Sequence, residues 1–260
     1  HEPMYDHPGV IDAIDRVESW GVSFVDPRIE EGKAKIPTEA TIVTEVARAT
    51  GPDPLDGQRV VVTSGATTES VDPVRTLSNR ASGRTGRAVA RACHTRGAEV
   101  VVVHDGPELP WATVERVETA AEMRDAVLSH ADGADALVSA AAISDYTVQT
   151  AQSKLRSGQE TVTLRLRPTS KLLDTVRAER PDLTMVGFKA ETDGDDTAIH
   201  ERARELQQRV GLSFVVGNDA GVMGETDTRA LLVDGDDHEV VEGSKTALGS
   251  RVADRLAAAL

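Results

Sequence analysis

The segment VVVTSGATTESVDPVRTLSNRASGRTGRAVA, residues 60–90, decides how the rest of the chain is interpreted. Its opening run of valines predicts a buried strand at residues 60–63, which Ser64-Gly65 then interrupts. A long polar loop follows, and helical spacing resumes near Ser82. A strand, a glycine-bearing loop and a helix in this order indicate a nucleotide-binding α/β unit, although the G-x-G-x-x-G spacing of dinucleotide-binding folds is missing.

The glycines of this segment predict an unusual backbone. Gly65, Gly83 and Gly86 allow a positive φ or a close approach of two backbones, which a side chain would block. The free amides of a helix that starts near Ser82 point outward and favour an anion. The sequence therefore predicts a phosphate site between the end of the strand and the start of the helix.

Polar side chains in the same loop supply complementary chemistry. Arg75 and Arg80 are charge-assisted donors suited to a phosphate or a carboxylate. Asn79 can donate and accept a hydrogen bond at once. These three side chains are candidates for holding an anionic substrate.

The rest of the chain alternates strands with helices. Strands are expected at 59–64, 99–104, 135–140, 184–188 and 213–217, and helices at 82–96, 120–131, 170–179 and 195–209. Continuous apolar runs such as Val100–Val103 favour strands covered on both faces. We therefore expect an α/β fold with a Rossmann-like, doubly wound, mostly parallel sheet. A C-terminal antiparallel hairpin, 230–241, and a closing helix, 245–260, complete it.

The N-terminal residues predict a separate unit at 1–50. Pro8 starts one helix, a short strand is expected at 22–25, and Thr38 caps a second helix. Residues 51–58, rich in glycine, proline and aspartate, are expected to be a linker to a domain at 59–260.

Composition limits the function classes. The formal net charge of -14 over 260 residues argues against nucleic acid and against an anionic membrane as partners. The chain has 6 lysines against 23 arginines, and its acid excess is typical of adaptation to high salt. An ordinary acidic cytosolic protein is the alternative, and retention of fold and activity in dilute buffer would favour it.

The single cysteine, Cys93, excludes an intrachain disulfide and fits a reducing, cytoplasmic setting. Its helical spacing with Val89 predicts a small core residue rather than a nucleophile. No apolar run reaches membrane-spanning length. Because the chain does not begin with Met, we expect a piece of a longer protein.

The motifs in the loop, S-G-A-T-x-E at 64–69, D-P-V-R at 72–75 and S-N-R-x-S-G at 78–83, resemble the phosphopantothenate-cysteine ligase family of coenzyme A biosynthesis. Further matches follow in family order within 59–260. They are A-A-x-x-D at 141–145, the start of a K-x-K-K flap at Lys154, V-G-F at 186–188, E-T at 191–192 and V-G-N-D at 216–219. In the flap, Arg156 and Ser157 replace lysines.

The resemblance implies a two-step reaction. The carboxylate of 4'-phosphopantothenate attacks the α-phosphate of CTP and releases pyrophosphate, and the amine of L-cysteine then displaces CMP from the acyl-cytidylate. The sequence leaves CTP and ATP open as the nucleotide. Mg²⁺ is the expected cofactor, and no metal ligands are identified.

Site residues follow from the matching motifs. Catalytic roles fall to Asn79, Arg75 and Lys154, and substrate binding to Asn79, Arg75 and Asn218. Nucleotide binding falls to Gly65, Ser82, Gly83, Ala141, Asp145, Lys154 and Phe188. Two of these have plainer alternatives: Asp145 as a helix cap or solvated loop acid, and Phe188 as an ordinary core aromatic.

The N-terminal piece resembles the tail of the flavin-dependent decarboxylase that is often fused ahead of the ligase in one bifunctional protein of the archaeal, halophilic type. Glu31-Gly-Lys-Ala-Lys35 stands where many bacterial members have a glycine-flanked cysteine, so neither FMN nor decarboxylation is expected in this polypeptide. In relatives an arm crosses to a second subunit, and residues 161–167 could form part of it. A homodimer is therefore expected.

Two rival functions remain. A short-chain dehydrogenase would need a Tyr-x-x-x-Lys pair, but Thr150 follows Tyr146 at that spacing. A non-catalytic nucleotide-binding module is favoured only by the altered flap. The histidines show no zinc spacing, and we expect them to be solvated or at helix ends.

Overall fold

The computed structural model describes residues 6–156, 158, 160–191, 195–219 and 227–260. The chain divides into two compact units, residues 1–51 and 52–260, and each is described by itself. Ser157 of the expected flap and Thr192 of the expected E-T pair lie outside the described residues.

The described residues of the first unit form two helices and a small hairpin. They are α2 (Pro8–Glu18), β1 (Arg28–Glu30), β2 (Lys33–Lys35) and α3 (Glu39–Thr50). The strand expected at 22–25 is wrong, since those residues are irregular. Pairing occurs later in the chain because Glu31 and Gly32 both adopt positive φ, 52° and 68°, and form the tight turn that a hairpin needs. The Thr38 cap is confirmed by its hydroxyl, which accepts from the Thr41 amide at 3.2 Å.

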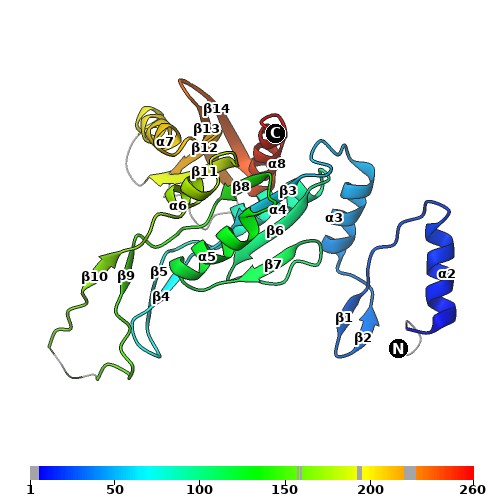
Figure 1. Ribbon diagram of the computed structural model, residues 1–260, viewed down its shortest axis with the longest axis horizontal. Helices are drawn as coiled ribbons and strands as arrows, with labels where there is room; N and C mark the ends of the chain where they lie inside the picture. Colours follow the sequence, from blue (N-terminus) through cyan, green and yellow to red (C-terminus); the bar gives the residue numbers. More distant parts are fainter. Residues whose placement is uncertain (1–5, 157, 159, 192–194, 220–226) are drawn as a thin grey trace. The chain divides into compact units, whose positions relative to one another are not determined.

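The second unit is built on an eight-stranded sheet in the order β14-β13-β12-β11-β8-β3-β6-β7 (Figure 1). Its strands are β3 (Arg59–Thr63), β6 (Glu99–His104), β7 (Thr113–Arg116), β8 (Ala136–Ser139), β11 (Thr184–Glu191), β12 (Phe214–Asp219), β13 (Asp227–Asp234) and β14 (Asp237–Ser244). Neighbouring strands pair in parallel along the run β12-β11-β8-β3-β6-β7. The pairs β12-β13 and β13-β14 are antiparallel. The predicted mostly parallel sheet and C-terminal hairpin are confirmed. The sequence did not predict β7, because Val114 is its only apolar residue.

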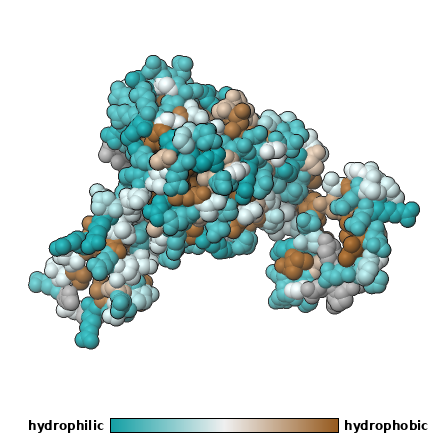
Figure 2. Space-filling model, in the orientation of Figure 1, coloured by the Kyte–Doolittle hydropathy of each residue, from teal (hydrophilic) through white to brown (hydrophobic). Residues whose placement is uncertain are grey.

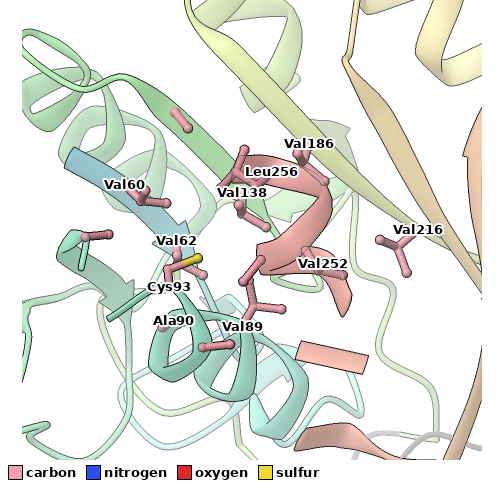
Figure 3. Close-up of a cluster of buried hydrophobic side chains, with 14 of the residues drawn as sticks. Val60, Val62, Val89, Ala90, Cys93, Val138, Val186, Val216, Val252 and Leu256 are labelled. Carbon is pink, nitrogen blue, oxygen red and sulfur yellow. The ribbon is translucent and has the colours of Figure 1, made fainter. Parts of the chain in front are cut away.

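Helices cover both faces of this sheet, which confirms the doubly wound architecture. Helices α4 (Arg84–His94) and α8 (Lys245–Ala257) contribute to one buried cluster, and α5 (Ala120–Ala131), α6 (Leu172–Glu179) and α7 (Asp196–Val210) contribute to the other. Alternate residues of β3 divide between the clusters: Val60 and Val62 join the first and Val61 the second. Figure 3 shows the first cluster, with Cys93 among the valines. Burial raises the pKa of the Cys93 thiol to about 12, as expected of a core residue.

The segment that was expected to be a linker is partly packed into the second unit. Leu55 is fully buried in the first cluster, and its amide donates to the Arg96 carbonyl at 2.8 Å. Glycine and proline content therefore indicated irregular structure at 51–58 correctly, but it gave no sign that one leucine anchors this stretch.

Two small antiparallel pairs lie outside the main sheet. The long loop after β3 folds into β4 (Thr68–Ser70) and β5 (Thr76–Ser78), and β9 (Tyr146–Val148) pairs with β10 (Leu166–Pro168) at the base of a projecting arm (Figure 1). Hydrophobic residues are interspersed with hydrophilic ones on this arm, whereas hydrophilic residues dominate most of the visible surface (Figure 2). None of the described helices has the length and apolar character needed to cross a membrane.

Helices α4 and α8 pack so closely that the contact requires glycine at position 249. A Cβ atom added there would lie 2.6 Å from the carbonyl carbon and oxygen of Ala88. We predict that Gly249→Ala lowers the free energy of unfolding by about 1–3 kcal/mol, because backbone cannot yield as a flexible side chain would.

The sign of this change in the free energy of unfolding tests the close packing. At an exposed helix position, Gly→Ala stabilises the helix by up to about 1 kcal/mol. Urea denaturation of Gly249→Ala beside Thr246→Ala, an exposed position of the same helix, measures it. Equal stability of the two variants would contradict the close packing.

Candidate active site

The site begins where β3 ends against the start of α4. The Ser64 hydroxyl is buried and donates to the Gly83 carbonyl at 2.8 Å. Gly65 and Gly83 have φ values of 82° and 69°, and a Cβ added to Gly86 would lie 2.7 Å from the Ser64 Cβ. Both predicted uses of glycine, positive φ and close approach, are confirmed. Helix α4 begins at Arg84 rather than at residue 82, because Gly83 is its left-handed N-cap.

This junction forms one wall of a pocket of about 810 Å³, its open mouth included. The other walls come from the carboxyl ends of β8, β11 and β12, where ligands bind in open α/β sheets. Six predicted site residues line the pocket: Gly65, Ser82, Gly83, Ala141, Phe188 and Asn218. Phe188 is half-buried and also packs against the first core cluster, so its two interpretations are compatible.

Some residues of this pocket were absent from the predicted site. Thr228 on β13 and Lys245 at the first position of α8 both line it. They come from the C-terminal hairpin and helix, more than 140 residues along the sequence from the loop after β3. The order of strands in the sheet brings them to the same pocket as that loop. Arg80, noted as a donor, and Arg84 line the same pocket.

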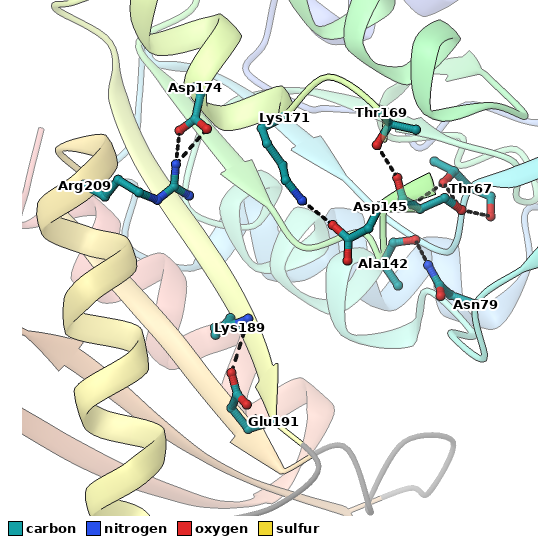
Figure 4. Close-up of polar contacts among 11 residues, drawn as sticks. Thr67, Asn79, Ala142, Asp145, Thr169, Lys171, Asp174, Lys189, Glu191 and Arg209 are labelled. Atoms are coloured by element: carbon teal, nitrogen blue, oxygen red, sulfur yellow. Dashed lines mark hydrogen bonds and ion pairs between the residues drawn. The ribbon is translucent and has the colours of Figure 1, made fainter. Parts of the chain in front are cut away.

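Asn79 lies beside a second, adjoining pocket of about 520 Å³. Its side-chain amide donates to the Ala142 carbonyl at 3.0 Å, which ties the loop after β3 to the loop after β8 (Figure 4). The two pockets share Gly65, Ala81 and Ser82. Asn79 is therefore held at the boundary between them.

A histidine at the second pocket corrects the expectation that the histidines are solvated or lie at helix ends. His104 ends β6, lines this pocket and is 1% exposed. Burial, followed by the nearby charge of Arg87, lowers the pKa of its imidazole. The run Val100–Val103 directly before it was the available signal, because the residue that ends a buried parallel strand lies at the ligand edge of the sheet.

A polar network supports the loop that carries Asp145 (Figure 4). The Thr67 hydroxyl accepts from the Ser144 amide at 2.8 Å, and the Thr169 hydroxyl donates to the Ser144 carbonyl at 2.6 Å. The exposed Asp145 carboxylate forms an ion pair with Lys171. Asp145 lines neither pocket, so the structure does not place it among the pocket residues.

Arg75 is also outside both pockets. Its guanidinium lies 2.6 Å from the buried carboxylate of Asp72 and 3.2 Å from the Leu155 carbonyl. Arg75 therefore joins the loop after β3 to the segment that carries the exposed Lys154. Lys154 likewise lines neither pocket.

Asp72 is the anchor of this arrangement. Burial alone would raise the pKa of its carboxyl, but the backbone amides of Leu155, Val74 and Arg75 donate to it at 2.8–3.0 Å. Together with the positive charge of Arg75, these amides lower the pKa to about 2.

Comparison with known proteins identifies the family of this chain. Residues 55–260 match the model of the DNA/pantothenate metabolism flavoprotein C-terminal domain family. The chain belongs to this family. It is 40% identical over 238 residues to the coenzyme A biosynthesis bifunctional protein CoaBC of Thermococcus kodakarensis, covering 90% of this chain and 59% of that protein.

Solved structures show the same family fold. The crystal structure of the C-terminal domain of a CoaBC protein has a TM-score of 0.65 at 27% identity, over 80% of this chain and 97% of that one. A Cab2 mutant in complex with phosphopantothenate-cysteine has a TM-score of 0.63 at 16% identity, over 86% and 96% of the two chains. Several of the motifs quoted from the sequence contribute residues to the two pockets, among them Gly65, Asn79 and Phe188, whereas Arg75, Asp145 and Lys154 lie outside both.

The pKa of Asp72 predicts a specific dependence of stability on pH. Because its pKa is about 2 in the folded protein and 3.8 in its ordinary state, Asp72 stabilises the fold above about pH 4, and this contribution is lost as pH falls toward 2. Asp72→Asn should therefore unfold more easily than the wild type at pH 5, and the gap should narrow toward pH 2.

Urea denaturation across this range measures the gap. Asp237→Asn, at the exposed start of β14, serves as the control. A gap that stays constant with pH would show that the charge of Asp72 does not anchor the loop.

Proposed function

We propose that this chain joins 4'-phosphopantothenate to L-cysteine in coenzyme A biosynthesis, with CTP converted to CMP and pyrophosphate. The main support is the position of Asn79, which is fixed by Ala142 between a pocket lined by predicted nucleotide residues and a second polar pocket. Membership of the family and 40% identity to a coenzyme A biosynthesis protein support the same activity. Since the chain spans 59% of that relative's length, the proposal concerns the ligase reaction alone.

In the first step, a carboxylate oxygen of phosphopantothenate attacks the α-phosphorus of CTP, and the bond to pyrophosphate breaks. Negative charge then develops on the transferred phosphoryl group. Arg80 and the backbone at Ser82 and Gly83 line the pocket at the start of α4, where donors and the helix dipole stabilise such charge. Phe188 offers an apolar surface for the base.

Mg²⁺ would enter with the nucleotide as part of the substrate. The described residues contain no cluster of three or more His, Cys, Asp or Glu side chains suited to an ion. Mg²⁺ typically binds triphosphate oxygens and water with few protein carboxylates, so the pocket fits a metal–nucleotide complex. CTP rather than ATP is our choice from the family resemblance.

In the second step, the cysteine nitrogen attacks the acyl carbon and the bond to CMP breaks. The nitrogen loses two protons in becoming an amide. Asn79 can orient the acyl-cytidylate through its side chain at the pocket boundary. Asn218 lines the first pocket and can contact the same intermediate.

The remaining predicted residues would act from outside the pockets. Arg75 and Lys154 belong to two segments that Asp72 joins, so we propose that they position the flap over the reacting phosphates. Asp145, which forms an ion pair with Lys171, would contact the ribose of the nucleotide or a cation on its triphosphate.

We further propose a homodimer through the arm and a requirement for high salt. Val162, Leu164 and Leu166 on the arm are 53%, 42% and 44% exposed, an apolar surface suited to a second copy. The net charge of -14 causes self-repulsion in the folded chain, and salt screens this repulsion.

The activity is tested by measuring pyrophosphate, CMP and the cysteine adduct from CTP, 4'-phosphopantothenate and Mg²⁺ at high potassium chloride, with and without L-cysteine. We expect pyrophosphate release to require phosphopantothenate, and CMP release to require L-cysteine as well. Binding of CTP with no release in any salt would instead favour a nucleotide-binding module.

Asn79→Asp should separate the two steps. The carboxylate cannot donate to the Ala142 carbonyl or to the intermediate, so we predict that pyrophosphate is released while amide formation falls by at least about tenfold. Thr76→Ala, an exposed position of the same hairpin, should match the wild type in both measurements. Equal losses of pyrophosphate and amide in Asn79→Asp would contradict the assignment.

A further inference from the structure

We propose that the second pocket, between Asn79 and His104, is the binding subsite for the zwitterionic head group of the amino acid substrate, L-cysteine. The inference rests on the proposed ligase function and gives a role to three lining residues that the sequence motifs leave unassigned. Arg87, His104 and Asp105 line this pocket, and none of them belongs to a predicted site motif. Each supplies a different part of the recognition.

Arg87 supplies a cation without a counter-charge. It is half-buried on α4, it donates to the Ser82 carbonyl at 3.0 Å, and no carboxylate of the described residues forms an ion pair with it. Burial, together with repulsion from Arg84, lowers the pKa of its guanidinium. A half-buried guanidinium that has no carboxylate partner attracts one, and it can bind that carboxylate through two parallel hydrogen bonds.

His104 supplies an unsatisfied polar group in the pocket wall. The imidazole is 99% buried, and neither ring nitrogen forms a hydrogen bond of normal geometry within the described structure, although the Pro107 backbone lies near enough to act on the pKa of the ring. A Cβ added to Gly106 would lie 2.5 Å from Nδ1, so the ring fills the space that this glycine leaves. Buried polar groups without a partner are rare and costly, and a bound polar ligand or its bridging water would remove this cost.

Asp105 distinguishes an amino acid from a phosphate chain. Its exposed carboxylate follows directly after β6 on the rim of the same pocket. A triphosphate tail would be repelled by this charge, whereas the ammonium group of a zwitterion would be attracted to it. A cation and an anion in the lining of one pocket therefore match the two charges of a free amino acid.

The position of the pocket agrees with the order of the reaction. It adjoins the proposed nucleotide pocket through Gly65, Ala81 and Ser82, and Asn79 lies at the boundary. An amine held here lies next to the acyl carbon of an intermediate held in the first pocket. The second pocket is mostly polar in its lining residues, as a zwitterion requires.

Steady-state kinetics of Arg87→Gln and Asp105→Asn test the subsite. We expect both variants to raise the KM for L-cysteine at least tenfold and to change the KM for CTP less than threefold. Cysteamine, which lacks the carboxylate, separates the two roles. With cysteamine as the substrate, Arg87→Gln should keep a kcat/KM within threefold of the wild-type value for cysteamine, whatever that value is. Asp105→Asn should lower the kcat/KM for cysteamine.

Matched controls make each outcome decisive. Glu108 lies in the same loop as Asp105, and its carboxylate pairs with Arg116 at 2.9 Å. The kinetics of Glu108→Gln should equal those of the wild type. Retained CTP binding shows that a variant is folded, and Arg87→Lys should recover part of the affinity for L-cysteine. A raised KM for CTP with an unchanged KM for L-cysteine would overturn the inference and assign the pocket to the triphosphate. An inactive wild-type chain would instead refute the proposed function.

Discussion

The contact between Ser64 and the start of α4 is the constraint on which the rest of the site depends. The Ser64 hydroxyl bonds the Gly83 carbonyl, and Gly86 lies against the Ser64 Cβ where no larger residue fits. This contact sets the distance between β3 and α4, and it leaves the backbone at Ser82 and Gly83 facing the first pocket. Helix α4 is in turn held by Gly249 of α8, so the helix layer and the site depend on the same close backbone packing.

Loops from distant parts of the chain are held around this junction by polar anchors rather than by apolar packing. Asn79 bonds Ala142, Thr67 bonds Ser144, and Asp72 binds the Leu155 amide. Each anchor joins the loop after β3 to the segment after β8. This division leaves the sheet rigid and apolar while the ligand edge remains polar, which suits a reaction that needs charge stabilisation more than a protein nucleophile.

The sequence predicted the sheet well because its strands are continuous apolar runs. It predicted the special backbone at Gly65, Gly83 and Gly86 because a positive φ or a close backbone approach requires glycine. It could not show the tertiary contacts of the site. Arg75 has the chemistry of a substrate ligand but is held by Asp72, which no local pattern shows. Thr228 and Lys245 reach the first pocket only through the strand order, and His104 became visible as a site residue only once its burial was known.

The central claim is that a carboxylate oxygen is transferred to the nucleotide at this sheet edge, and an isotope measurement tests it most directly. With 4'-phosphopantothenate labelled by ¹⁸O in its carboxylate, L-cysteine and CTP, the chain should produce CMP that carries one ¹⁸O atom by mass spectrometry. The pyrophosphate should be unlabelled. Unlabelled CMP, or CDP with ¹⁸O in inorganic phosphate, would contradict the acyl-cytidylate and the assignment of the first pocket to its formation.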